Sequence, residues 1–266
     1  MSNSIRKWVF VLLVPIVVLG ILGSVGGAGH KLPLQSANVD VHDTASLQRG
    51  FKYYVNYCMG CHSLKFSRYN RVAEDIGLNA DNGFSEDDVA KLLKEEIIFT
   101  YDEEGKQTKT GELMKNAYSP KAAAQAFGTS VPDLSLVGRS RGPDWIYSYL
   151  KGFYLDPSRP TGVNNIVFDK VGMPHVLGNL QGWQVLEHAE GEGEHHGAPK
   201  LVLQKPGKLS PAEYDKMVRD LTNFLTYVSE PAQLSRYTIG IFVILFLLLF
   251  FGVAYLLEKE YWKDIH

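Results

Sequence analysis

The residues whose types and spacing most clearly indicate a chemical role are Cys58, Cys61 and His62. They form a Cys-x-x-Cys-His motif, which includes the only two cysteines of the 266 residues. Each thiol can bond to one vinyl group of a haem, because two intervening residues let both sulfurs reach the same porphyrin edge. The histidine that follows is then placed under the iron as proximal ligand. The motif therefore predicts one covalently bound haem c. With both cysteines used in this way, no disulfide is expected.

Two other uses of paired cysteines compete with this interpretation. A thioredoxin-like redox pair has the same Cys-x-x-Cys spacing, but it belongs in a β-α-β setting that the surrounding sequence lacks. A structural zinc site would need a fourth ligand, which only another histidine could supply. The directly adjacent His62 favours haem attachment over both.

The residue on the other face of the iron would determine the function, since methionine gives a high-potential electron carrier and an open face gives ligand binding or peroxidase-type chemistry. Met59 lies between the cysteines and cannot reach that face. Met217 falls in a predicted helix as a core residue, and Met114 lies in a charged stretch with little apolar support. Met173 is the best candidate for this ligand. His175, two residues later, is the main competitor and would give a bis-histidine haem.

Met173 lies between Gly172, which permits close backbone approach, and Pro174, which stiffens the following turn. The surrounding stretch 154–208 has no clear periodicity and predicts a long loop. Such a loop is unusual in a compact domain unless it serves a ligand. Within it, histidines and glutamates interspersed with glycines at 187–197 could bind a metal, but a solvated loop is the simpler interpretation.

Several stretches carry capping residues or an early proline that indicate helices. The first begins at Asp43 or Thr44 and ends at the haem motif, with its apolar side toward the expected porphyrin. The last follows a capping box at Ser210 and ends at Pro231. The expected fold is mostly α, a class I cytochrome c-like haem domain with long loops. The predicted helices are 44–58, 85–97, 119–128, 142–152 and 210–230, with 131–135 extended.

Both ends of the chain are apolar. Residues 1–28 have the charged, apolar and small-residue regions of a cleaved signal peptide. Residues 236–258 contain an uncharged run long enough to cross a bilayer as a helix. We therefore expect an exported haem domain at 29–235, a C-terminal anchor, and a cytoplasmic tail at 259–266. This places the haem domain in the periplasm, on a bacterial inner membrane.

The charge distribution bears on partners. The formal net charge of −2 offers no basic surface for nucleic acid, so no nucleic-acid partner is expected. The segment 86–104 has eight acidic and two basic residues, a net charge of −6. It is either an ordinary solvated face or a docking patch for a basic protein, since such charges mainly speed encounter.

Taken together, these features resemble the cytochrome c1 family, the haem subunits of cytochrome bc1 complexes. The resemblance covers about residues 40 to 266 and is far more specific than the haem motif alone. It rests on these stretches, in order: Ser46-Leu47-Gln48-Arg49-Gly50-Phe51, Tyr54-Val55, Cys58-Met59-Gly60-Cys61-His62-Ser63, Pro132-Asp133-Leu134-Ser135 with Arg139, Gly172-Met173-Pro174, and Ser229-Glu230-Pro231 before a single C-terminal span.

The resemblance implies roles for particular residues. Cys58 and Cys61 would form the thioether bonds, and His62 and Met173 would be the axial iron ligands. Pro132 would pack on the haem, and Arg139 would face a haem propionate. Two positions depart from the family. Val131 stands where a first proline is usual, and Trp145 stands where a tyrosine is common, so that a hydroxyl contact to a propionate would be missing.

The resemblance also implies a function. The chain would be a non-catalytic electron-transfer subunit of a ubiquinol:cytochrome c oxidoreductase, held beside cytochrome b. It would take an electron from a Rieske iron–sulfur protein and pass it to a c-type cytochrome. One alternative is another membrane-anchored monohaem cytochrome, such as an oxidase subunit. The other is a haem enzyme or gas sensor with an exchangeable sixth ligand.

Overall fold

The computed structural model describes residues 34–101, 104–116, 118, 120–187 and 200–265. The chain divides into two compact units, Met1–Leu34 and Gln35–His266. The predicted signal segment 1–28 and most of the histidine- and glutamate-rich stretch at 187–197 lie outside the described residues.

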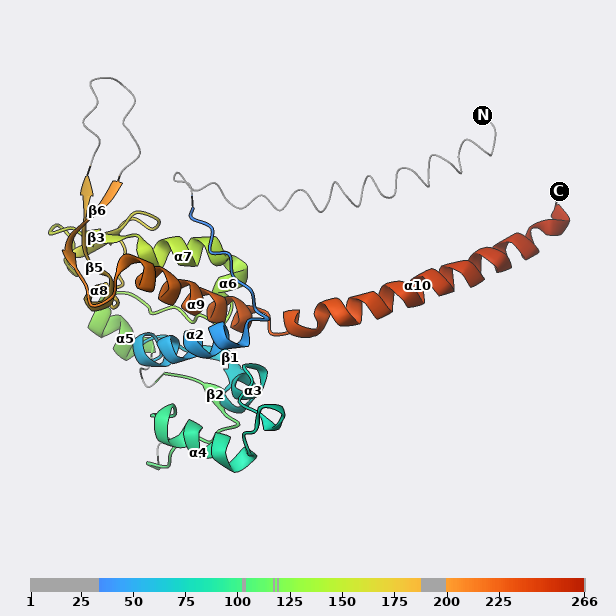
Figure 1. Cartoon of the computed structure of the whole chain (residues 1–266), viewed down its shortest axis with the longest axis horizontal. Helices are drawn as coiled ribbons and strands as arrows, with labels where there is room; N and C mark the ends of the chain where they lie inside the picture. Colours follow the sequence, from blue (N-terminus) through green and yellow to red (C-terminus); the bar gives the residue numbers. More distant parts are fainter. Residues whose placement is uncertain (1–33, 102–103, 117, 119, 188–199, 266) are drawn as a thin grey trace, which may run out of the picture. The chain divides into compact units, whose positions relative to one another are not determined.

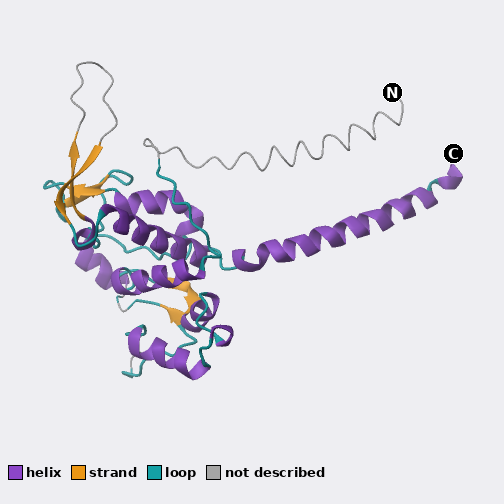
Figure 2. Cartoon of the chain, viewed as in Figure 1, coloured by secondary structure: helices purple, strands orange, loops and turns teal. Residues whose placement is uncertain are grey.

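Helices dominate the second unit, as predicted (Figures 1 and 2). The helices are α2 (Thr44–Tyr57), α3 (Tyr69–Asp75), α4 (Glu86–Glu96), α5 (Pro120–Phe127), α6 (Val137–Ser140), α7 (Pro143–Lys151), α8 (Gly178–Gln181), α9 (Pro211–Ser229) and α10 (Gln233–Tyr261), with short 3-10 helices η1 (Ala80–Asn82) and η2 (Lys263–Ile265). The strands are β1 (Leu64–Arg68), β2 (Leu113–Met114), β3 (Phe153–Leu155), β4 (Val163–Asn165), β5 (Gly182–Glu187) and β6 (Lys200–Pro206).

Three of the predicted helix starts are confirmed by side-chain caps. The Asp43 carboxylate accepts a hydrogen bond from the Ser46 backbone N–H at 2.9 Å, which fixes the start of α2. Ser85 and Ser210 each open a complete capping box, at α4 and α9. These caps satisfy backbone donors that the first helical turn leaves free, so local sequence alone can set the helix start.

The core of the domain is the contact between α2 and α9, which lie side by side (Figure 1). Gly50 makes this possible, because a Cβ atom there would lie 2.1 Å from the Asp220 carbonyl oxygen. Phe224 fills the space next to it, with ring centroids 5.3 Å from Phe51 and 5.6 Å from Tyr54. The close approach fixes the helix that ends at the haem motif.

A buried carboxylate joins the same two helices. Asp220 is only 4% exposed, and its two oxygens accept hydrogen bonds from Arg49 Nε at 2.6 Å and Ser46 Oγ at 2.7 Å. Asn223 Nδ2 then donates to Ser46 Oγ at 3.1 Å. A buried charge needs such partners, because an unpaired one carries a large desolvation cost. The network therefore fixes the position of α2 along α9.

Two further helices pack on α9. The Gly138 backbone N–H on α6 donates to Ser229 Oγ at 2.8 Å, and the missing side chain of Gly138 permits this contact. On α7, the Leu150 carbonyl accepts a hydrogen bond from the Tyr214 hydroxyl at 2.9 Å. Together, α2, α7 and α9 form the helical support of the site.

The prediction that 154–208 is a loop without regular structure is wrong. Strands β3 and β4 pair antiparallel from Phe153–Asn165 to Leu155–Val163, and β5 and β6 form a second antiparallel pair. The buried side chain of Asn165 stabilises this segment through hydrogen bonds. Its Nδ2 donates to the Tyr149 carbonyl, and its Oδ1 accepts from the Val167 N–H. Because the strands of the first pair have three residues each and β4 is largely polar, no periodic pattern reveals them.

Beyond the haem motif, β1 pairs with β2, and α3 and α4 follow (Figure 1). Met114 lies in β2 opposite Leu64 and is fully buried. The expectation of little apolar support at Met114 is therefore wrong, since the support comes from a strand about fifty residues away.

The C-terminal helix α10 is long and apolar enough to cross a membrane, and none of its most apolar stretch is buried against the rest of the protein. A core helix would be covered, so the exposed apolar surface supports a membrane anchor. The helix extends a few residues beyond both ends of the predicted span 236–258.

Candidate functional site

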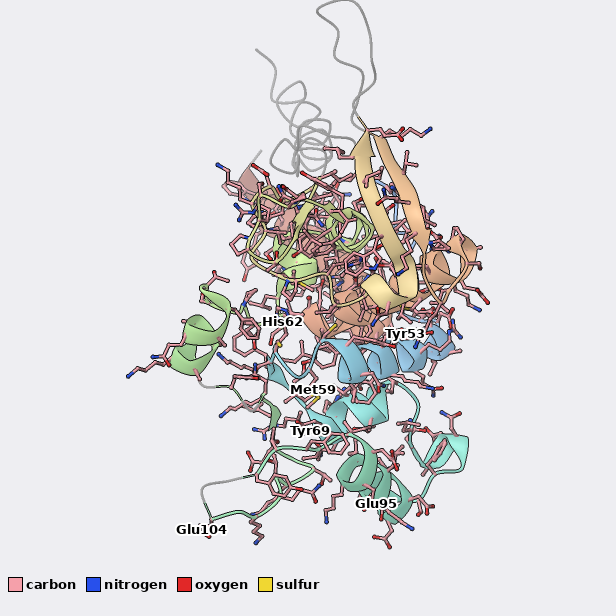
Figure 3. All side chains as sticks on the ribbon, turned by 90° about the vertical axis from the view of Figure 1, so that its left-hand side faces the viewer. Tyr53, Met59, His62, Tyr69, Glu95 and Glu104 are labelled. Carbon is pink, nitrogen blue, oxygen red and sulfur yellow. The ribbon has the colours of Figure 1, made fainter. Side chains whose placement is uncertain are left out.

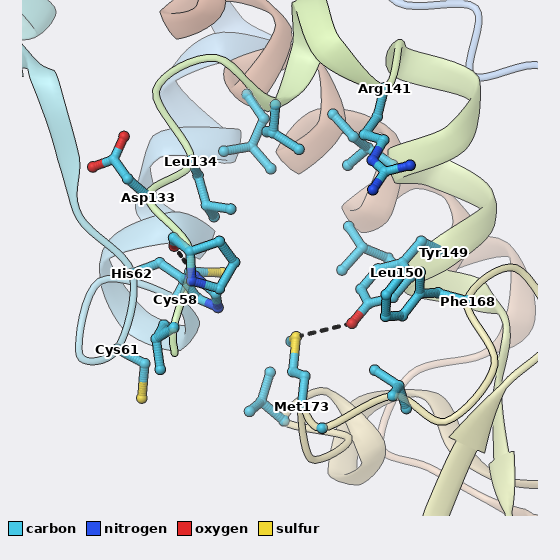
Figure 4. A pocket seen from close by; sticks show the side chains of 18 of the residues that line it. Cys58, Cys61, His62, Asp133, Leu134, Arg141, Tyr149, Leu150, Phe168 and Met173 are labelled. Carbon is cyan, nitrogen blue, oxygen red and sulfur yellow. Dashed lines mark hydrogen bonds between the residues drawn. The ribbon is translucent and has the colours of Figure 1, made fainter. Parts of the chain in front are cut away.

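A cavity of about 500 Å³ opens between the end of α2, helix α7 and the segment that contains Met173 (Figure 4). This volume lies in the range typical of cofactor sites. Its lining is mainly apolar and includes Leu134, Ile146, Leu150, Leu221 and Leu225. Cys58, Cys61 and His62 line one wall, and Met173 lines the other.

The haem motif forms a tight turn directly after α2. The backbone N–H groups of Cys61 and His62 donate to the Cys58 carbonyl at 3.0 and 2.8 Å. The Tyr54 hydroxyl donates to the His62 carbonyl at 2.7 Å, which ties the end of the turn back to the helix. His62 and Met59 lie on different sides of the motif (Figure 3), and Met59 does not line the cavity.

The His62 ring is oriented by Pro132. His62 Nδ1 lies 2.8 Å from the Pro132 carbonyl oxygen. Since that oxygen can only accept, Nδ1 carries the proton and Nε2 keeps a free lone pair. Burial lowers the pKa of His62, which favours the neutral ring.

Asp133 holds the chain at Pro132 in place. Its carboxylate accepts from the Lys65 N–H and from the Ser135 N–H, each at 2.9 Å. The Leu134 N–H donates to the Ser63 carbonyl at 3.0 Å, which ties this segment to the residue after the haem motif. The extended conformation predicted for 131–135 therefore serves to present the Pro132 carbonyl to His62.

Cys58 lacks the property that a reactive redox cysteine needs. Burial raises the pKa of Cys58 to about 12, with a smaller contribution from Cys61. A reactive redox cysteine needs a lowered pKa, because the thiolate is the nucleophile. The motif also follows a helix and precedes an antiparallel strand pair, which is not a β-α-β setting. Within the described ranges, no group of three or more His, Cys, Asp or Glu residues is arranged to hold a metal ion.

Met173 is the methionine that faces this cavity. Its sulfur lies 3.4 Å from the Tyr149 hydroxyl oxygen (Figure 4). Met114 and Met217 are buried elsewhere, and neither lines the cavity. Gly172 permits the approach of this segment to Thr129, because a Cβ there would lie 2.9 Å from Thr129 Cγ2.

His175, the competing candidate, does not line the cavity. Its ring stacks on Phe153 with centroids 4.7 Å apart and meets Trp183 edge-on. Burial lowers the pKa of His175 to about 4, so the ring is neutral and acts as a packing residue. The geometry thus favours Met173 over His175.

Arg139 does not face the cavity, contrary to expectation. Its side chain is 62% exposed and lies 3.9 Å from the Glu230 carboxylate. Arg141, two residues later, lines the cavity instead (Figure 4). Its guanidinium carbon lies 5.1 Å from the centre of the Trp145 ring. The two arginines lie two residues apart at the end of the short helix α6, and side chains at that spacing on a helix project to nearly opposite sides.

Comparison with known proteins identifies the family. Residues 35–189 and 205–265 match the Cytochrome C1 family. The chain is 50% identical to cytochrome c1 of Allochromatium vinosum over 259 residues, which covers 97% of both chains. The chain belongs to the cytochrome c1 family. Cytochrome c1 proteins carry one covalently attached haem c and are the electron-transfer haem subunits of bc1 complexes.

Two other relatives extend the comparison. The chain is 26% identical to cytochrome c1 of Rhodobacter capsulatus over 83% of its length and 84% of the relative. It is also 45% identical to a Nitrosomonas europaea protein named ammonia monooxygenase gamma subunit, over 90% of this chain and 92% of that one. The family match and the 50% identical relative together show membership of the cytochrome c1 family.

The site of this family member fits haem c. Both thiols line the cavity beside a histidine whose Nε2 is free, and the remaining wall is apolar enough to cover a porphyrin. The Trp145 Nε1–H is buried and has no hydrogen-bond partner in the described part of the chain. Arg141 and Trp145 therefore give this wall one cationic and one neutral hydrogen-bond donor. The indole N–H of Trp145 is thus available at the position where a tyrosine hydroxyl is common in the family.

Sequence reasoning missed Arg141 and Tyr149. Tyr149 follows Trp145 by four residues on the predicted helix, so the two share one face, and their rings stack with centroids 4.9 Å apart. The four-residue spacing could have placed Tyr149 beside Trp145 from the sequence alone. The contact between Tyr149 and the Met173 sulfur could not be predicted, because it depends on how the segment after β4 returns to α7.

Proposed function

We propose that this chain transfers electrons through a haem c bound covalently by Cys58 and Cys61, with His62 and Met173 as axial ligands. The observation that carries the proposal is the placement of Met173 on the wall opposite His62 (Figure 4). Bound haem c supplies one-electron exchange at its iron. The protein contributes attachment, ligation, exclusion of water and access for partners.

The two histidine nitrogens have different tasks in this proposal. Nδ1 is committed to the Pro132 carbonyl, and this bond fixes the ring and leaves Nε2 as the nitrogen that would bind the iron. Pro132 thus positions the ligand as well as lining the cavity. Met173 supplies a neutral, soft thioether, which favours ferrous over ferric iron and raises the reduction potential.

The lining of the cavity supports electron transfer without acid–base chemistry. Among the described lining residues, Asp133 is the one carboxylate, and both of its oxygens accept backbone N–H groups. Both oxygens are thus engaged in holding the loop that presents the Pro132 carbonyl to His62. We therefore propose that the subunit is non-catalytic.

We further propose that the electron comes from a Rieske iron–sulfur protein and passes to a c-type cytochrome, with cytochrome b as the membrane neighbour. Membership of the cytochrome c1 family and the exposed apolar helix α10 support this arrangement. Covalent haem attachment supports a periplasmic location for the haem domain, on the outer side of a bacterial inner membrane.

Substitution of Met173 tests the ligation. Met173→Leu keeps apolar bulk but removes the donor, so the haem should stay attached through Cys58 and Cys61. The potential should fall, the ferric methionine–iron charge-transfer band should vanish, and the reduced iron should bind carbon monoxide. Redox titration and absorption spectra of the full chain measure these changes.

Met114→Leu is the matched control, because Met114 is fully buried away from the cavity. A near-isosteric core change of this kind usually costs less than about 1.5 kcal/mol. If the Met114 variant loses the band and the Met173 variant keeps it, the ligand assignment is wrong. Carbon monoxide binding by the unsubstituted reduced protein would instead favour a haem enzyme or sensor.

The name of the Nitrosomonas europaea relative raises a second candidate, an electron-transfer subunit of an ammonia monooxygenase. The haem site would be the same, and only the partners would differ. Mild detergent purification of the native complex separates the two candidates. Co-elution of cytochrome b and an iron–sulfur protein supports the bc1 assignment, and co-elution of monooxygenase subunits without them supports the other.

A further inference from the structure

Tyr149 contacts the sulfur of Met173. The hydroxyl oxygen lies 3.4 Å from Sδ, within hydrogen-bond range for sulfur (Figure 4). In the described part of the chain, no second hydrogen-bond partner of this hydroxyl is found. A phenol can donate and a thioether can only accept, so the hydrogen lies between oxygen and sulfur.

The position of the Tyr149 ring is fixed from several sides. It stacks on Trp145 at an interplanar angle of 10° and meets Phe153 edge-on, with centroids 5.3 Å apart. The Tyr149 backbone carbonyl accepts from Asn165 Nδ2 at 2.8 Å, which links α7 to β4. Because the ring cannot swing away without breaking this packing, the hydroxyl is directed at one place in the cavity wall.

We propose that Tyr149 is a positioning residue that donates a hydrogen bond to the Met173 thioether and thereby raises the reduction potential of the haem. This inference rests on the proposed function, in which Met173 ligates the iron. A thioether sulfur has two lone pairs. If one accepts the Tyr149 hydrogen, the other is left for the iron, so the hydroxyl selects which side of the sulfur binds.

The sign of the effect follows from the charge on the iron. A hydrogen bond draws electron density from the sulfur and makes it a weaker donor. Ferric iron, with the higher charge, depends more on donation than ferrous iron does. The hydrogen bond therefore disfavours the ferric state, and its removal should lower the potential.

The magnitude should be that of one ordinary hydrogen bond, about a fivefold change in the ferrous-to-ferric ratio at a fixed ambient potential. Since a tenfold change is about 59 mV for one electron, fivefold corresponds to about 40 mV. The same weakening acts on the iron–sulfur bond. Removal of the Tyr149 hydrogen bond should therefore raise the imidazole concentration needed to displace Met173 from ferric iron, also by about fivefold.

The test is Tyr149→Phe in the full chain, purified in detergent, with redox titration and imidazole titration of the charge-transfer band. The change removes one oxygen atom and keeps the ring stack, so folding and haem attachment should persist. Tyr147→Phe is the control. It removes the same atom from the same helix, but the Tyr147 hydroxyl contacts Asp215 and not the sulfur.

The expected result is a lower potential and greater resistance to imidazole for Tyr149→Phe, with no change for Tyr147→Phe. An unchanged or raised potential in Tyr149→Phe, with the band intact, overturns the role of Tyr149 and leaves Met173 as the ligand. Absence of the band in the unsubstituted protein overturns the ligation itself. An equal decrease in both variants would assign the effect to helix α7 and also overturn the proposal.

Discussion

Gly50→Ala should destabilise the haem domain because it places a methyl group between α2 and α9. The new Cβ would lie 2.1 Å from the Asp220 carbonyl oxygen and 2.7 Å from Phe224 Cβ. Ordinary contact begins at 3.4 Å, so the methyl and the oxygen must separate by about 1.3 Å beyond the present spacing. The obstacle is helix backbone, which cannot rotate away as a flexible side chain can.

Overpacking of a core costs about 1–3 kcal/mol, and a rigid obstacle favours the upper end of that range. The separation would also stretch the bonds from Arg49 and Ser46 to the buried Asp220 carboxylate. For a domain of this size, about 3 kcal/mol lowers the melting temperature by roughly 6–12 °C. Because α2 ends at the haem motif, the variant should also contain less haem per chain.

Thermal unfolding of the full-length protein in detergent, followed by circular dichroism at one heating rate, measures the effect. Gly111→Ala is the control, because a Cβ at Gly111 meets no atom within 4 Å and its backbone has no positive φ. A Gly50→Ala protein that melts within about 2 °C of the unsubstituted one would refute the close contact between the helices.

Three further outcomes are expected. Arg141→Gln should lower the reduction potential, by about 1 kcal/mol or less, since a lost cation near the haem favours the ferric state, whereas Arg139→Gln should leave redox titrations unchanged. A chain ending near Ser235 should be soluble without detergent and keep a c-type spectrum, and haem loss on size-exclusion chromatography would contradict this. Lysine at the exposed positions Asp87 and Glu95 on α4 should slow electron transfer to a basic cytochrome. Added salt should remove this effect, because charges are screened beyond about 10 Å at 0.1 M. Equal rates for the variant and the unsubstituted protein at low salt would mark an ordinary solvated surface.

The features that could be predicted from sequence are those fixed by neighbours in the chain. The capping boxes at Ser85 and Ser210 involve residues three apart, and the structure has both. The haem motif is equally local, and its three residues line one cavity. In each case, the physical cause lies within one helical turn, so residue types and spacing are sufficient.

The features that could not be predicted depend on distant parts of the chain. Met114 is buried because β2 pairs with Leu64, although its sequence neighbours are charged. The Asn165 side chain stabilises the segment around β4 through bonds to Tyr149 and Val167, which no hydropathy pattern reveals. Arg139 and Arg141 project to opposite sides of α6, and which of them lines the cavity depends on how α6 packs against the distant helix α9.

The junction between α9 and α10 limits how far the haem domain can travel. Only Glu230, Pro231 and Ala232 separate the two helices, and three extended residues span at most about 11 Å. Such a short tether limits how far the domain can move from its anchor helix, and Pro231 reduces the freedom of the connection further. The subunit cannot carry charge between distant sites by swinging. Under the proposed function, its redox partners must therefore come to the haem domain.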